Sequence, residues 1–184
     1  MKVESYIEIT PGSVMLNGQT VEVTETGDKM LVELYRRYVG DYPKFFKMDT
    51  LSRLGFIAAE MLLKSTDRFT DRVQSTETAI ILANKSASIK NDTEYLATIS
   101  NGNYYPSPAL FVYTLPNIVT GEIAIRHHIQ GETAFYILEN PGQLEPIIKS
   151  TLTANHSPLT VIAGWCECSE PNRYYAKLQI IWNN

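Results

Sequence analysis

Two cysteines and three histidines are the side chains of this 184-residue chain with the clearest capacity for covalent or metal chemistry. Cys166 and Cys168 are separated by one residue in a predicted strand, where they cannot bridge each other comfortably, so we expect reduced thiols. A zinc site that joined them to His156 would be short of the usual four ligands, and the C-x-x-C spacing is absent. We therefore expect buried or half-buried strand thiols, no metal and no cofactor.

The remaining ionisable candidates have simpler interpretations. His127 and His128 end a predicted helix, where positive charge is favourable, so we interpret them as exposed capping residues rather than catalytic groups. Glu122 and Glu167 are interpreted as structural hydrogen-bond partners, because a buried carboxylate requires compensation. The sequence contains no paired-carboxylate motif, no phosphate-binding glycine loop and no serine elbow.

Composition limits the class of protein. With 44% hydrophobic residues and no low-complexity tract, the chain fits one globular domain over residues 1–184. Its formal charge of −4 argues against nucleic acid, since a phosphate backbone requires a basic surface. The amino-terminal residues lack a signal-peptide core, and no stretch reaches the roughly 18 apolar residues of a membrane span. We expect a cytoplasmic protein that binds neither nucleic acid nor membrane.

The first third of the chain predicts a hairpin and two helices. Alternating runs at residues 5–9 and 13–23 are broken by turn residues that include Asn17-Gly18, a pair that tolerates positive φ. Residues 28–38 carry apolar side chains at helical spacing. Asp49 can cap a longer helix whose apolar stripe continues to Leu62.

Strands and helices alternate from residue 78 onward. The continuous apolar run at residues 78–83 predicts a strand covered on both faces. Further strands are predicted at residues 134–138, 159–166 and 175–182, and helices at residues 92–99, 117–128 and 142–154. This order predicts an α/β sheet of mostly parallel strands, with a hairpin-like pair closing its C-terminal edge.

Three segments, in order, resemble β-ketoacyl synthases. The longest, at residues 106–131, is PSPALFVYTLPNIVTGEIAIRHHIQG, in which a Pro-x-x-Phe element leads to Pro-Asn, a Gly-Glu-Ile-Ala helix and a closing Gly. The flanking segments are MDTLSRLGFIAAEMLL at residues 48–63, similar to the family's early helix, and VIAGWCE at residues 161–167, similar to its strand ending in Ala-Gly-x-x-Glu. The resemblance covers the chain from about Lys47 onward and reaches only the N-terminal half of a synthase.

The resemblance implies a thiolase-like half, with a five-stranded mixed sheet between helices and, in this chain, an N-terminal hairpin. In the family, such a half packs against a second, similar half. The strand that leads to the nucleophile pairs with the same strand of another subunit. The corresponding dimer strand consists of Ala134, Phe135, Tyr136, Ile137 and Leu138. We therefore expect a homodimer, or a heterodimer with a ketosynthase.

In the family's register, the nucleophile position falls at Asn140. A Cys opens the helix there in ketosynthases, and the helix N-terminus stabilises its thiolate. Here the run at residues 138–142 is LENPG, and an amide cannot form the acyl thioester. Asn140 suits a helix cap and Pro141 the first helical position. The alternative is that the amide mimics an acylated nucleophile, as a Gln does in chain-length-factor partners of ketosynthases.

The family's other catalytic residues, two His or a His and an Asn, belong to the half that the resemblance does not reach.

Eight of the sixteen basic residues gather between residues 36 and 72, against five acidic ones. Because acyl carrier proteins are acidic, these residues form a candidate carrier-protein face, and the alternative is a solvated helix surface. The face consists of Arg36, Arg37, Lys44, Lys47, Arg53, Lys64, Arg68 and Arg72.

The leading hypothesis is a non-catalytic ketosynthase-like protein. With no catalytic residue of its own, it would support acyl-chain synthesis of the fatty acid, polyketide or aryl-polyene type through dimerisation. One alternative is a minimal thioester-dependent acyltransferase that uses Cys166. A second alternative is a scaffold remnant that binds neither acyl groups nor a carrier protein.

Overall fold

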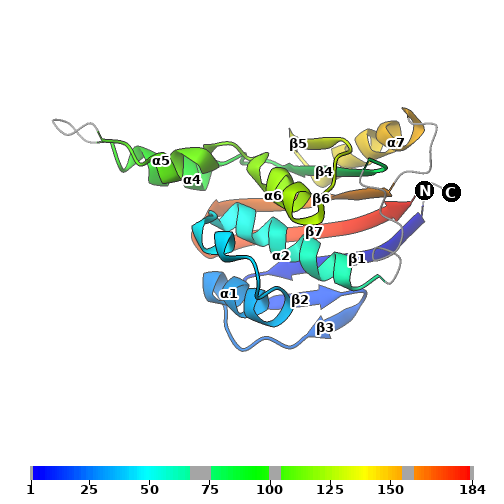
Figure 1. Ribbon diagram of the computed structural model, residues 1–184, viewed down its shortest axis with the longest axis horizontal. Helices are drawn as coiled ribbons and strands as arrows, with labels where there is room; N and C mark the ends of the chain where they lie inside the picture. The colour runs from blue at the N-terminus through cyan, green and yellow to red at the C-terminus, as the bar shows by residue number, and fades with distance from the viewer. Residues whose placement is uncertain (1, 67–75, 100–104, 155–159, 183–184) are drawn as a thin grey trace.

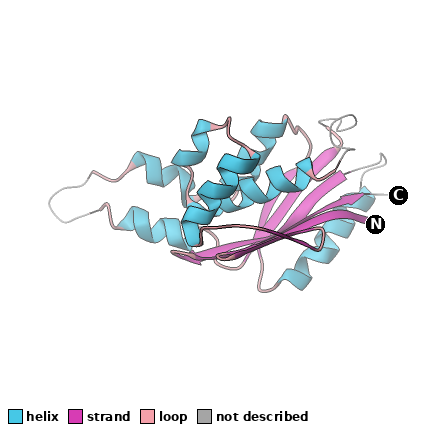
Figure 2. Cartoon of the chain, turned by 90° about the horizontal axis from the view of Figure 1, so that it is seen from below, coloured by secondary structure: helices cyan, strands magenta, loops and turns pink. Residues whose placement is uncertain are grey.

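A computed structural model describes residues 2–66, 76–99, 105–154 and 160–182. These residues form a seven-stranded mixed sheet with helices on both faces (Figures 1 and 2). The strands are β1 (Lys2–Thr10), β2 (Ser13–Leu16), β3 (Gln19–Val21), β4 (Thr78–Asn84), β5 (Thr133–Ile137), β6 (Thr160–Glu170) and β7 (Arg173–Trp182). The longer helices are α1 (Gly27–Tyr38), α2 (Thr50–Lys64), α4 (Ile89–Leu96), α6 (Ile118–His127) and α7 (Leu144–Ala154).

The sheet, in the order β3-β2-β1-β7-β6-β4-β5, joins an antiparallel part to a parallel part. β1 pairs antiparallel with β2 and β7, and β7 pairs antiparallel with β6. β4 pairs parallel with both β6 and β5. Parallel strands end at the same edge of a sheet, so the ends of β4 and β5 meet: the Leu138 amide donates to the Asn84 carbonyl oxygen at 2.8 Å. β5 stands at the edge of the sheet, and β4 is its sole partner among the described residues.

β4 is buried along its whole length, as its unbroken apolar sequence predicted. Ile80 and Leu82 belong to the core cluster that also contains side chains of α1, α2 and α6. Ala79, Ile81 and Ala83 face the opposite side, where α7 covers them. The sheet therefore separates two hydrophobic layers, and β4 contributes to both.

Helix α2 is almost completely buried between the sheet and α6. Asp49 caps it as predicted, since its carboxylate accepts a hydrogen bond from the Ser52 amide at 3.0 Å. Glu60 is 1% exposed, and its carboxylate accepts a hydrogen bond of 3.0 Å from Nε of Arg126, which lies on α6. Burial raises the pKa of Glu60, but hydrogen bonds and charges from His127 and Arg126 outweigh burial and hold that pKa below its usual value.

The structure corrects the predicted sheet in three respects. The sheet has seven strands rather than five, because β1 pairs with β7 and so continues the sheet into β2 and β3. Its pairings are antiparallel except for those of β4 with β5 and β6, so it is not mostly parallel. The β6–β7 pair lies inside the sheet rather than at an edge, because β1 covers the far side of β7. The element order from β4 onward is as predicted, with a short helix α5 (Pro108–Phe111) and a 3₁₀ turn η2 (Val112–Thr114) added. Asn117 immediately precedes α6, and its side chain makes no capping hydrogen bond.

None of the described helices alone is long and apolar enough to cross a bilayer. The segments Pro108–Thr114 and Ile118–His127 reach the required length and composition together, but they are bent by 94° relative to each other.

Two helical glycines provide a matched pair of substitutions. A Cβ on Gly55 of α2 would lie 2.3 Å from Cγ2 of Val119 on α6, whereas one on Gly121 of α6 would meet nothing within 4 Å. Gly55→Ala is expected to lower the free energy of unfolding by about 1–3 kcal/mol, because the tightly packed interface must shift. Gly121→Ala is expected to raise it by roughly 0.5–1 kcal/mol through helix propensity. Urea unfolding followed by circular dichroism checks both, and changes of the same sign would contradict this packing.

Candidate functional site

The corner between β5 and α7 contains the position predicted for the family nucleophile. Asn140 caps the 3₁₀ turn η3 (Pro141–Gln143), and its Oδ1 accepts a hydrogen bond from the Gly142 amide at 3.1 Å. In return, Oε1 of Gln143 accepts from the amides of Glu139 and Asn140 at 2.8 and 3.3 Å. This reciprocal capping confirms the interpretation of Asn140 as a helix cap. It holds an amide, which is no nucleophile, at the start of the helical segment.

Charged and polar groups tie this corner to the end of β4. Lys85, the first residue after β4, pairs with Glu139 at 2.8 Å. Each partner charge favours the other, so the pKa of Lys85 is raised and that of Glu139 is lowered. Glu167 of β6 accepts a hydrogen bond from the Lys85 amide at 2.8 Å and from the Ser86 hydroxyl, which confirms its predicted structural role. The corner therefore lies where β4, β5 and β6 are joined.

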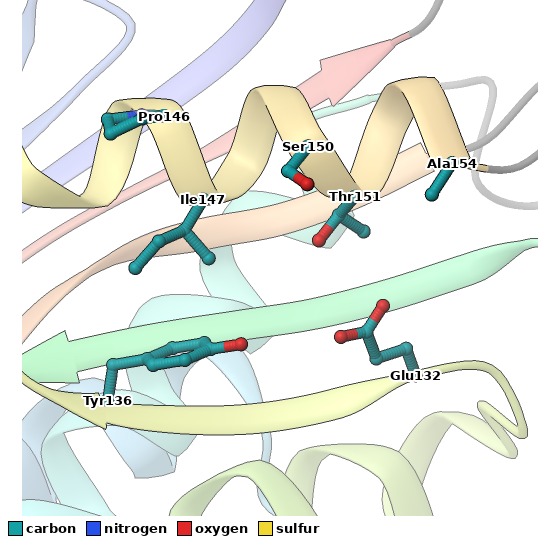
Figure 3. Close-up of a pocket in the computed structure, with 7 residues that line it drawn as sticks. All are labelled: Glu132, Tyr136, Pro146, Ile147, Ser150, Thr151 and Ala154. Atoms are coloured by element: carbon teal, nitrogen blue, oxygen red, sulfur yellow. The ribbon is translucent and has the colours of Figure 1, made fainter.

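Two grooves flank α7. The first, of about 470 Å³, lies between α7 and β5, with Tyr136 and Glu132 on the strand side facing Ile147 and Ser150 on the helix (Figure 3). The second, of about 300 Å³, starts at Pro141 beside the corner and lies between α7 and the sheet. Its apolar lining residues include Val3, Leu144, Ile148, Trp165 and Tyr175. An apolar surface thus begins directly beside Asn140, which sequence periodicity alone did not indicate.

Both cysteines are free and buried in the core cluster with α2. They share a face of β6 because side chains two apart on a strand point the same way. Sγ of Cys166 lies 3.8 Å from the Leu51 carbonyl oxygen. Burial raises the pKa of Cys166 well above its usual value and that of Cys168 to about 12. Neither sulfur is a thiolate near neutral pH, and neither lies at the β5–α7 corner.

The other predicted chemical residues have structural partners. Glu122, buried on α6, pairs with Lys44 at 2.6 Å, which confirms its interpretation as a structural residue. His127 differs from its prediction as an exposed cap, because its Nε2 lies 2.8 Å from the buried carboxylate of Glu60. His128 is exposed and terminates α6 in the left-handed region. In the part of the chain that the structure describes, no three His, Cys, Asp or Glu side chains form a metal-binding group, and His156 lies outside that part.

The candidate carrier-protein face is engaged in part by contacts within the chain. Four of its side chains have partners: Lys44 with Glu122, Lys64 with Glu60, Arg37 with Glu33, and Arg53 with the carbonyl oxygens of Phe45 and Phe46. Arg36 and Lys47 are exposed on α1 and on the 3₁₀ turn η1 (Pro43–Lys47), with no ion pair among the described residues. Arg68 and Arg72 lie outside the described residues.

The predicted dimer strand presents an open backbone edge. Hydrogen bonds at its two ends join Glu132 O and Leu138 N to β4. Because backbone groups alternate in direction along a strand, the amides of Thr133, Phe135 and Ile137 point toward the open edge. The Ile137 side chain is 52% exposed, and those of Ala134, Phe135, Tyr136 and Leu138 are half-buried. In the described part of the chain, β5 pairs with no strand at this edge.

Comparison with known proteins gives matches to solved structures. No protein-family model and no curated protein matches the sequence. The complex of the ketosynthase ApeO with its chain length factor ApeC from Xenorhabdus doucetiae matches with a TM-score of 0.65 and 12% identity, over 100% of this chain and 79% of the matched one.

Two further structures match 97% of this chain and 61% of their own chains. The ishigamide ketosynthase/chain length factor has a TM-score of 0.64 and 15% identity. The AntDE:AntF structure, a type II polyketide synthase acyl-carrier protein in complex with its ketosynthase bound to the hexaketide, has a TM-score of 0.68 and 11% identity. At such identities the likeness concerns the fold. The chain therefore has the thiolase-like fold of ketosynthases and chain length factors, as its sequence resemblance implied.

Proposed function

We propose that this chain is a non-catalytic ketosynthase-like protein that supports acyl-chain synthesis by pairing with a ketosynthase or with itself. The observation that carries the proposal is Asn140, which stands where β5 turns into α7 in a ketosynthase-like fold. Acyl transfer at this corner requires a nucleophile that forms a thioester, and a capped amide has none to offer. The reacting thiolate would have to come from the partner.

The structural neighbours support the choice of partner. Two of them contain a ketosynthase together with a chain length factor, and one contains an acyl-carrier protein with its ketosynthase. By analogy, this chain takes the place of a chain length factor in a fatty acid, polyketide or aryl-polyene pathway. The apolar groove that begins at Pro141 would offer an apolar surface to an acyl chain that grows near the corner.

The open edge of β5 supports strand pairing as the mode of association. Its outward amides of Thr133, Phe135 and Ile137 are free to donate to a second strand, and β-branched and aromatic residues favour such pairing. The acyl carrier protein would dock on the candidate carrier-protein face. On this face, Arg36 and Lys47 have no ion-pair partner among the described residues. Complementary charge at these positions would speed its encounter with the pair.

Ile137 offers a sharp test of pairing, because its amide points away from β4. Ile137→Pro removes that outward donor without breaking the β4–β5 ladder, whereas Ile137→Thr keeps the donor and a β-branched side chain. With an intact ketosynthase from the same organism and its carrier protein, we expect the wild-type chain and Ile137→Thr to raise product formation at least several-fold. The Ile137→Pro variant is expected not to raise the rate of product formation by the ketosynthase. The wild-type chain without a ketosynthase is expected to form no product.

Each other outcome has a definite meaning. Product from this chain without a ketosynthase would overturn the non-catalytic assignment. Stable association with the ketosynthase but an unchanged rate would favour the scaffold alternative. Equal stimulation by Ile137→Pro and Ile137→Thr would show that β5 is not the pairing strand.

The acyltransferase alternative requires a reactive Cys166, and the burial of this thiol argues against it. Incubation of the folded chain with malonyl thioester, or with iodoacetamide at pH 8, is expected to give no adduct on either cysteine. Alkylation should appear at both positions once guanidinium unfolds the protein. Intact-mass measurement checks this, with Cys166→Ser as control. A thioester adduct on the folded chain that Cys166→Ser abolishes would favour the acyltransferase.

A further inference from the structure

A polar cavity of about 320 Å³ lies between α1, the start of α2 and α4. Its lining residues come from these helices and from η1, α5 and η2, so segments that are distant in sequence form it together. Its volume is at the lower end of the range of roughly 300–1,000 Å³ that small-molecule sites occupy. No residue of β5 or α7 lines it, so a ligand here would be separate from an acyl chain at the β5–α7 corner.

Asn91, on α4, brings an unpaired acceptor to this cavity. The residue is 1% exposed, and its Nδ2 donates to the carbonyl oxygen of Leu110 at 2.8 Å. Because a carbonyl oxygen can only accept, this contact fixes which end of the amide is the donor. The other end, Oδ1, is buried and accepts no hydrogen bond from the described residues. A buried acceptor without a donor is costly, so a donor placed in the cavity would be bound favourably.

Asp28, on α1, supplies a second acceptor and a negative charge. Its Oδ2 accepts a long hydrogen bond of 3.4 Å from the Thr50 hydroxyl, whereas its buried Oδ1 has no donor among the described residues. Asp49 adds a carboxylate whose pKa is raised by burial, although hydrogen bonds at the start of α2 act against this effect. A partly dehydrated site with two carboxylates and a free amide oxygen favours a cation that donates hydrogen bonds.

The basic side chains that line the cavity differ in what they already contact. Arg53 donates to two backbone carbonyl oxygens of η1, and Lys90 pairs with Glu94 at 2.7 Å. Lys47, which also belongs to the candidate carrier-protein face, is exposed and has no ion-pair partner among the described residues. The cavity therefore offers one unpaired cation together with its two unpaired acceptors.

We infer that this cavity binds a small zwitterion of the α-amino-acid type with an apolar side chain. The protonated amine would donate to Oδ1 of Asp28 and Oδ1 of Asn91, and the carboxylate would pair with Lys47. Phe46, which is 50% exposed, and the buried Tyr113 line the same cavity. These two rings provide the apolar surface for the side chain of the ligand.

An organic ammonium group fits the cavity better than a metal ion does. Over the described ranges, no three His, Cys, Asp or Glu side chains form a metal-binding group. Lys47, Arg53 and Lys90 line the cavity and would repel a divalent cation. A zwitterion avoids this repulsion, because its single positive charge is accompanied by a carboxylate that a lysine attracts.

Isothermal titration calorimetry of the full chain tests the inference, with L-phenylalanine as the probe. We expect binding to one saturable site at millimolar concentrations or below. The analogue 3-phenylpropionate lacks the amine, and phenethylamine lacks the carboxylate, so each is expected to bind about tenfold more weakly or worse. The first analogue tests the two acceptors, and the second tests Lys47.

Two substitutions separate the roles of the side chains. Asp28→Asn keeps the size of the side chain and removes its charge, so it should weaken binding of L-phenylalanine by about tenfold or more. Lys47→Met should weaken that binding several-fold but leave binding of phenethylamine unchanged, since this analogue has no carboxylate. The matched controls are Glu25→Gln and Lys29→Met, at exposed positions outside the cavity, which should bind as the wild-type chain does. Circular dichroism verifies that every variant is folded.

Three results would overturn the assignment. The first is a folded chain that does not bind L-phenylalanine, or that binds it equally well as Asp28→Asn. The second is equal binding of 3-phenylpropionate, which would show that the amine is not recognised. The third is binding of Mg²⁺ in place of L-phenylalanine, lost in Asp28→Asn, which would identify a metal site. Product formation with a ketosynthase, the readout of the proposed function, is independent of all three.

Discussion

The structure depends on one fully buried strand, β4, with parallel partners on both sides. Its side chains enter both hydrophobic layers, so the sheet requires α2 and α6 on one face and α7 on the other. Each Ile or Leu that it buries contributes on the order of 1.5–3 kcal/mol, which exceeds the roughly 0–1 kcal/mol of a typical exposed ion pair. Parallel pairing then places the end of β5 beside the end of β4, whereas β6 continues past that point to Glu170. The positions of the β5–α7 corner and of the open edge of β5 follow from that arrangement.

Polar groups at the end of β4 direct the chain toward α4. Asn84 is fully buried, and its side-chain amide both donates to the Ala87 carbonyl oxygen and accepts from the Ala87 amide at 2.9 Å. A buried amide whose hydrogen bonds are satisfied locally fixes the direction of the backbone. The chain therefore leaves β4 in a defined direction.

The β5–α7 corner shows how a strand-to-helix turn can persist without catalysis. In this chain the cap formed by Asn140 and Gln143 satisfies the free amides at the turn, so the geometry is stabilised by hydrogen bonds alone. The sulfur atoms of the chain serve a different purpose, because both thiols fill the core beside α2. The turn therefore keeps its geometry without a catalytic residue at this corner.

Sequence reasoning succeeded where a single segment contains its own information. The burial of β4 follows from its unbroken apolar run, and the caps at Asp49 and Asn140 follow from side chains that reach amides two or three residues away. The alternation of strands and helices, together with the resemblance carried by residues 106–131, gave the thiolase-like fold that the structural neighbours share.

Tertiary structure alone decided what depends on residues distant in sequence. The seven-stranded sheet arises because β1 pairs with β7 across the whole length of the chain. Likewise, only the fold shows that His127 meets the buried Glu60 and that Lys44 is neutralised by Glu122. Local propensity and spacing act over a few residues. The pairing of distant strands and the formation of ion pairs are set by which elements pack together, and that is a property of the whole chain.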